Sequence, residues 1–262
     1  MTFRLTHPAV FALIAAISFG LPISAADGIA GPYLAGRLAS VAKDYRQAAG
    51  YFSRALIADP ANPQFLENAI LSQIAAGESA RALPMAAQMD RLKVESQGAN
   101  MLAFATLARD ADFAGMLAAL EAGRSAGTLV DGLLKAWAMV GEGRMTDAIA
   151  AFDDVAEIEG LQAFGLYHKA LALASVGDFE GADKILSGEA DGPLRVTRRG
   201  VIAHAEVLSQ LERAPDAIEL VSAAFGDSLD PGLAKVRVDL TAGRPLPFTV
   251  APDAKAGIAE VF

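Results

Sequence analysis

The sequence predicts an all-α fold, an α-solenoid built from about six degenerate helix–turn–helix hairpins. Three observations predict it: alanine is abundant along the chain, β-type alternation is rare, and one short window recurs at a nearly constant spacing. Alanine is the strongest helix former, whereas strands favour alternating β-branched and aromatic residues. The run KVRVDL at 235–240 is the one stretch that reads as a possible strand.

The recurring window is clearest in GDFEGADKIL, residues 177–186. A repeat with a period of 20–50 residues indicates stacked structural units. Each window follows a helical segment and precedes a second amphipathic segment, so its first residue marks the turn of a hairpin, where glycine relieves the constraint on φ. The first residues of the six windows are Lys43, Gly77, Ala111, Gly143, Gly177 and Glu212, at spacings of 34, 34, 32, 34 and 35 residues.

An alanine at the sixth position of most windows lets the two helices of a hairpin approach closely. These alanines are Ala48, Ala82, Ala148, Ala182 and Ala217. Repeat three differs, because it has Ala111 at the turn and Met116 at the alanine position. The six repeats are placed at 29–62, 63–96, 97–128, 129–162, 163–196 and 198–231.

The hairpins resemble the tetratricopeptide repeat (TPR) family, and repeat one resembles it most. That repeat carries, at the family spacing, Gly36, Tyr45, Ala48, Phe52, Ala55 and the closing pair Asp59-Pro60. The resemblance covers about 200 residues and implies a right-handed superhelix with a concave groove lined by the first helix of each hairpin.

Carrying the family's groove positions onto this chain gives a mostly apolar and aromatic candidate site. The implied groove residues are Tyr33, Arg37, Met101, Leu133, Trp137, Phe164, Tyr167, Leu171, Ile202 and Glu206. Aromatic side chains are favoured anchors at interfaces, and an apolar groove suits an amphipathic helix or an extended apolar peptide. The alternative is that Trp137 and its neighbours form the core between repeats.

The N-terminus has the layout of an export signal. Residues 1–26 contain Arg4, an apolar stretch from Ala9 to Ile23, and the small residues SAA at 24–26. This pattern is typical of a cleavable secretory signal peptide and predicts a periplasmic protein. The alternative is an uncleaved anchor in the inner membrane.

The composition and the missing motifs argue against several classes of function. The formal net charge is −9 with no basic stripe, which disfavours nucleic acid as a partner. There is no cysteine, hence no disulfide or thiolate site. His168, His204 and Glu206 could be neighbours, but ordinary helix histidines are the favoured interpretation. No phosphate-binding loop or nucleophile motif occurs, so we expect no enzyme activity, no cofactor, and no catalytic or metal-binding residue.

Residues 232–262 depart from the repeat period. We expect a helix, then a proline-rich extended segment near 241–255, then a helix that starts at Pro252-Asp253. Because the sequence ends on apolar Phe262, either the natural chain continues, or the last helix docks elsewhere, or the protein has a small apolar tail. The predicted function is a protein–protein interaction scaffold of the bacterial envelope. The alternative is the binding module of a larger envelope enzyme, secretion or assembly machine.

Overall fold

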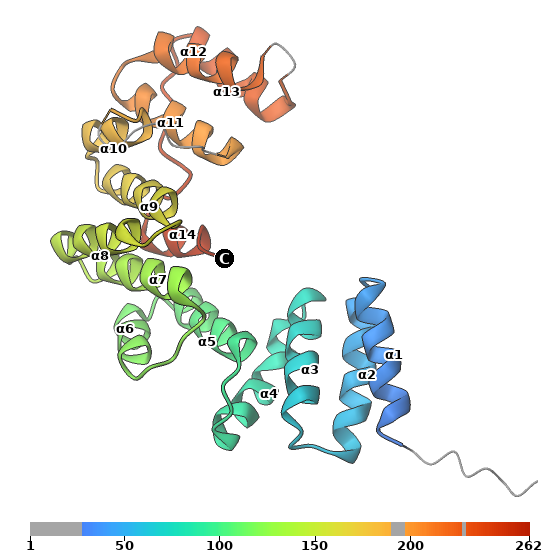
Figure 1. Ribbon diagram of the computed structural model, residues 1–262. Helices are drawn as coiled ribbons and strands as arrows, with labels where there is room; N and C mark the ends of the chain where they lie inside the picture. Colours follow the sequence, from blue (N-terminus) through green and yellow to red (C-terminus); the bar gives the residue numbers. More distant parts are fainter. Residues whose placement is uncertain (1–27, 190–196, 227–228) are drawn as a thin grey trace, which may run out of the picture. The chain divides into compact units, whose positions relative to one another are not determined.

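The computed structural model describes residues 28–189, 197–226 and 229–262, and over these ranges it is all-helical, without a strand. The predicted signal peptide, residues 1–26, lies outside them. The chain forms two compact units, one up to Glu78 and one from Ser79 to Phe262. Figure 1 shows successive helices packed in pairs within each unit. The all-helical class and the repeated helix pairs are therefore confirmed.

Two helices correspond to each of the six predicted repeats, and the boundary between the two units falls inside the second repeat, between its two helices. Unit 1 contains α1 (Ala30–Val41), α2 (Tyr45–Ala58) and α3 (Pro63–Ala75). Unit 2 contains α4 (Ser79–Leu92), α5 (Gln97–Arg109), α6 (Phe113–Glu121), α7 (Thr128–Gly141), α8 (Met145–Glu157), α9 (Gln162–Ser175), α10 (Phe179–Leu186), α11 (Arg198–Gln210), α12 (Ala214–Phe225), α13 (Pro231–Thr241) and α14 (Ala254–Ala259). The possible strand at 235–240 was wrong, since those residues lie in α13.

The first residue of every window adopts the left-handed conformation that the turn requires. The six φ angles are 60° at Lys43, 75° at Gly77, 53° at Ala111, 74° at Gly143, 87° at Gly177 and 59° at Glu212. In the fifth hairpin the Asp178 amide then donates to the Leu173 carbonyl at 3.0 Å, which closes the first helix. The Asp178 carboxylate accepts from the Gly181 amide at 2.9 Å and caps the second helix.

The predicted small residue on the second helix of each hairpin is fully buried. Ala48, Ala82, Ala148, Ala182 and Ala217 are all 0% exposed. In the third hairpin Met116 occupies this position and is equally buried. A longer, flexible side chain therefore fills the same site in the third hairpin.

The C-terminal residues fold back onto α5, α7 and α9, each of which is the first helix of its hairpin. After α13 the chain has no regular structure from Arg244 to Thr249, as the prolines predicted. Asp253 then caps α14 by accepting from the Ala256 amide at 2.8 Å. Helix α14, red in Figure 1, packs mainly against α7 and also against α9 and α5. We call residues 246–262 the C-terminal segment.

Candidate functional site

Most of the predicted groove residues of unit 2 gather in one place, beneath the C-terminal segment. Leu133, Trp137 and Leu171 are between 0% and 2% exposed, and they share a core with Val250, Ala251, Ala254 and Ile258 of that segment. Met101, Tyr167 and Ile202 are half-buried against the same core. Phe164, on α9, stays 48% exposed. In unit 1, Tyr33 is half-buried and Arg37 is exposed.

Trp137 is the centre of this core. Its indole Nε1 donates to Nδ1 of His168 at 3.0 Å, and its ring meets Phe152 edge-on with centroids 5.5 Å apart. Gly257 of α14 lies directly on the indole, since a Cβ built there would be 2.4 Å from three ring carbons. Only glycine permits such a close approach of backbone to ring.

His168 is held neutral by its surroundings. The side chain is buried, and desolvation lowers the pKa of its imidazole to about 4. Because Nδ1 accepts from Trp137, the neutral ring carries its proton on Nε2. The pair is therefore a structural hydrogen bond that depends on an uncharged histidine.

Glu206 on α11 binds the backbone of the C-terminal segment. Its carboxylate accepts from the Thr249 amide at 2.7 Å, from the Thr249 hydroxyl at 2.6 Å and from the Val250 amide at 3.3 Å. Glu206 is only 6% exposed, and these hydrogen bonds satisfy a charge that would be costly to bury unpaired.

Three more residues of α11 hold the segment, and sequence reasoning missed them. The Ser209 hydroxyl accepts from the Leu246 amide at 2.8 Å, and the Gln210 amide group donates to the Leu246 carbonyl. The guanidinium of Arg199 donates to the Glu260 carboxylate at 2.6 Å and to the Val250 carbonyl at 3.2 Å. This pairing with Glu260 raises the pKa of Arg199. The available signal was the polar set 206, 209 and 210, which the helical spacing places on one face of α11.

The groove prediction therefore needs a correction about access. Leu133, Trp137 and Leu171 share a core with the chain's own C-terminal segment, so they are not accessible in this structure. Phe164 and Arg37 stay exposed. Trp137 is core, as the alternative interpretation held, and the C-terminal segment supplies part of that core. Whether these side chains contact a partner stays a prediction.

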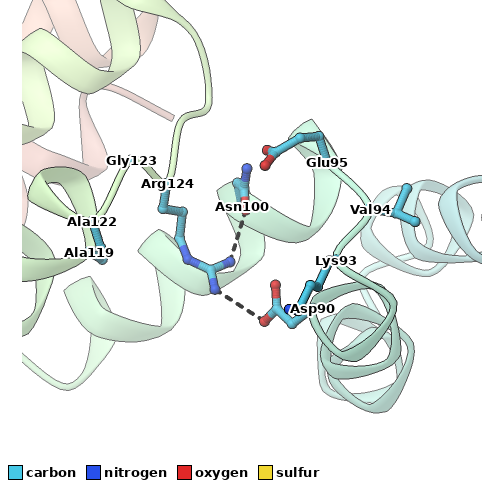
Figure 2. A pocket seen from close by; sticks show the side chains of 9 residues that line it. All are labelled: Asp90, Lys93, Val94, Glu95, Asn100, Ala119, Ala122, Gly123 and Arg124. Atoms are coloured by element: carbon cyan, nitrogen blue, oxygen red, sulfur yellow. Dashed lines mark hydrogen bonds and ion pairs between the residues drawn. The ribbon is translucent and has the colours of Figure 1, made fainter.

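A separate cleft of about 400 Å³ lies among α4, α5 and α6. Figure 2 shows Arg124 reaching across it toward Asn100 and Asp90. The guanidinium donates to Asn100 Oδ1 at 2.9 Å and to Asp90 Oδ2 at 3.1 Å. Asn100 in turn donates to the Ser125 carbonyl at 2.7 Å. Arg124, Asn100 and Asp90 are therefore engaged with one another across the cleft, which Lys93 and Glu95 also line.

The histidines and Glu206 do not come together as metal ligands. His168 accepts from Trp137, His204 Nε2 lies 2.7 Å from Asp183, and Glu206 binds the C-terminal segment. Over the described ranges, no cluster of three or more His, Asp or Glu side chains could hold a metal ion. None of the helices in these ranges is both long enough and apolar enough to cross a membrane.

Comparison with known proteins adds no assignment. No protein-family model matches this chain, and no curated protein sequence is significantly similar to it. The resemblance to tetratricopeptide repeats stays a prediction from the sequence.

Proposed function

We propose that this protein is a non-catalytic protein–protein interaction scaffold of the bacterial envelope. On this proposal it binds a segment of a partner protein along the first helix of each hairpin in unit 2. The observation that carries the proposal is the way α11 holds the C-terminal segment, through main-chain hydrogen bonds to Leu246, Thr249 and Val250. Main-chain hydrogen bonds of this kind give affinity for an extended peptide.

The apolar part of the same surface supports binding rather than catalysis. Trp137, Leu133 and Leu171 supply a large aromatic and aliphatic area for a helical turn, and such anchors dominate interface energies. Glu206, Ser209 and Gln210 each hold the backbone of the C-terminal segment. The helix pairs, which resemble tetratricopeptide repeats, are a scaffold of the kind that displays such surfaces.

The envelope location rests on the sequence of residues 1–26. A charged start, an apolar stretch and small residues at 24–26 are the features of a secretory signal. On this basis the partner is a protein of the same compartment. Cleavage of the signal would be visible as a loss of about 26 residues in the mass of the mature chain.

Site-specific crosslinking in the envelope tests this function. A photoreactive residue replaces Phe164, a predicted groove residue on α9 that is 48% exposed. The control places it at Val238 of α13, which is 59% exposed and lies outside the predicted groove. We expect a discrete crosslinked protein from position 164 and none from position 238. Equal capture at both positions, or none at either, would contradict the proposal.

A further inference from the structure

We propose that the C-terminal segment is an exchangeable ligand of the site it occupies, and that the partner displaces it with a segment of the same chemistry. That chemistry is an extended stretch in which two successive backbone N–H groups can donate to the site. A helical turn follows, with a glycine and, three residues later, an acidic residue. In this chain these features are Thr249-Val250, Gly257 and Glu260. The inference rests on the proposed function and specifies its ligand.

The extended stretch is recognised through its main chain. Glu206 accepts the amides of Thr249 and Val250, while Ser209 and Gln210 engage the amide and carbonyl of Leu246. All non-proline residues offer these groups, so α11 selects an extended backbone, and the Thr249 hydroxyl adds one side-chain contact to Glu206. A segment from another protein can make the same hydrogen bonds.

The helical turn is recognised by shape and by charge. The indole of Trp137 excludes any side chain at the position of Gly257. Arg199 then pairs with Glu260, one turn further along, at 2.6 Å. Because Arg199 also donates to the Val250 carbonyl, it holds both parts of the ligand in register. Glycine and acid at this spacing are the side-chain signature of the ligand.

The connection to α13 permits exchange. Ala242, Gly243, Arg244 and Pro245 are all exposed, and Gly243 has a φ of 69° that suits a turn. The covalent link gives the segment an effective concentration of the order of millimolar for a short linker. A partner must therefore bind more tightly than the segment does, which makes the segment a built-in competitor.

The segment leaves room for a better ligand at one point. The Tyr167 hydroxyl is buried but has no hydrogen-bond partner in the described part of the chain. Desolvation, together with the nearby charge of Glu260, raises the pKa of Tyr167 to about 12. A buried hydroxyl without a partner weakens binding. A partner segment that offers an acceptor to Tyr167 gains affinity that the chain's own segment lacks.

The test converts the internal contact into a measurable complex. A specific protease site is inserted between Arg244 and Pro245 of the full chain, and the folded protein is cut there. A fluorescent synthetic peptide of residues 246–262 is then added in excess. We expect the labelled peptide to replace the cut segment, and fluorescence anisotropy measures this replacement. Circular dichroism should show that the helices persist.

Two peptide variants provide a matched comparison. Gly257→Val places a branched side chain against Trp137, whereas Ala259→Val makes a similar change at an exposed position of the same helix. We expect the first to bind at least tenfold more weakly than the parent peptide and the second to bind within about threefold of it. Tyr167→Phe in the protein should leave the affinity unchanged or raise it.

Each outcome decides the inference. If the cut segment does not exchange in the folded protein, the segment is a fixed part of the core and the inference is overturned. If both valine peptides bind equally, the glycine does not specify the ligand, which overturns the proposed chemistry. The crosslink from position 164 is read independently, so the scaffold function can fail or stand whatever the exchange result.

Discussion

The same position of the repeat is open to solvent in unit 1 and closed in unit 2. Six residues before each turn residue stand Leu71 in unit 1 and Trp137 and Leu171 in unit 2. Leu71 is 48% exposed, whereas Trp137 and Leu171 are 0% exposed. The difference arises because the C-terminal segment covers α7 and α9 of unit 2. A groove position becomes core when a distant segment of the chain covers it.

Two further positions show the same dependence on what packs against a helix. Nine and five residues before the turn, the first hairpin has Leu34 and Leu38, which are 59% and 71% exposed. The equivalent residues of the fourth hairpin, Leu134 and Ala138, are both 0% exposed. Repeated sequence therefore predicts the helix reliably, but the burial of each position depends on what packs against it.

The largest expected effect contrasts Trp137→Ala with Leu71→Ala. The first change removes a fully buried indole that contacts Phe152, His168 and Gly257, and should destabilise unit 2 by roughly 3–5 kcal/mol. The second removes a half-exposed side chain at the same repeat position and should cost less than about 1 kcal/mol. Urea unfolding followed by far-ultraviolet circular dichroism measures both. Equal losses would show that the two positions are not differently covered.

Acid should destabilise the core beneath the C-terminal segment by protonating His168. Its pKa in the folded state is about 4, below the ordinary value near 6.5, so between these two pH values the unfolded state binds more protons. The stability is thus fully present above pH 6.5 and is lost as the pH falls toward 4, by about 3 kcal/mol in total. Urea unfolding at several pH values measures this slope.

His168→Gln is the matched control for the acid effect. Glutamine is uncharged over this range and its side-chain oxygen can accept from Trp137 Nε1. The variant should therefore unfold with a smaller pH slope between 6.5 and 4 than the unmodified chain. An NMR titration that found the His168 ring ionising near 6.5 would contradict the assignment of a neutral buried ring.

A smaller and local effect is expected from Glu206→Ala. The change removes the single carboxylate oxygen, Oε2, that accepts both the Thr249 and the Val250 amides, so both amides lose their acceptor. Hydrogen bonds to a charged group contribute about 1.5–3 kcal/mol, so amide exchange at these two residues should accelerate roughly 10- to 100-fold. Glu212→Ala, at an exposed turn, is the control and should leave their exchange rates unchanged.

The sequence predicts the hairpins well because their signals are local. The turn glycines, the capping Asp178 and the buried Ala182 lie within one window and determine the hairpin without reference to the rest of the chain. The helical class and the repeated helix pairs follow from such windows.

The site covered by the C-terminal segment was less predictable because its contacts join residues far apart in the sequence. The carboxylate of Glu206 meets Thr249, 43 residues away, and Arg199 meets Glu260, 61 residues away. No periodicity relates these residues, since the C-terminal segment lies outside the repeats. Pro252-Asp253 predicted the start of the last helix, but docking of that helix was only one of three alternatives, and the surface on which it docks was not predicted.

The smallest expected effect compares the turn residue of two repeats. Gly177 has a φ of 87° and Ala111 a φ of 53°, and side chains other than glycine are strained in this region by roughly 1–2 kcal/mol. Gly177→Ala should therefore destabilise unit 2 by about 1 kcal/mol, measured by urea unfolding. Ala111→Gly relieves that strain but adds freedom to the unfolded chain, and should stabilise by less than about 1 kcal/mol. Changes of opposite sign in the free energy of unfolding would show that the two turns prefer the same left-handed conformation, although the surfaces beside them differ. A stabilising Gly177→Ala would contradict the left-handed turn.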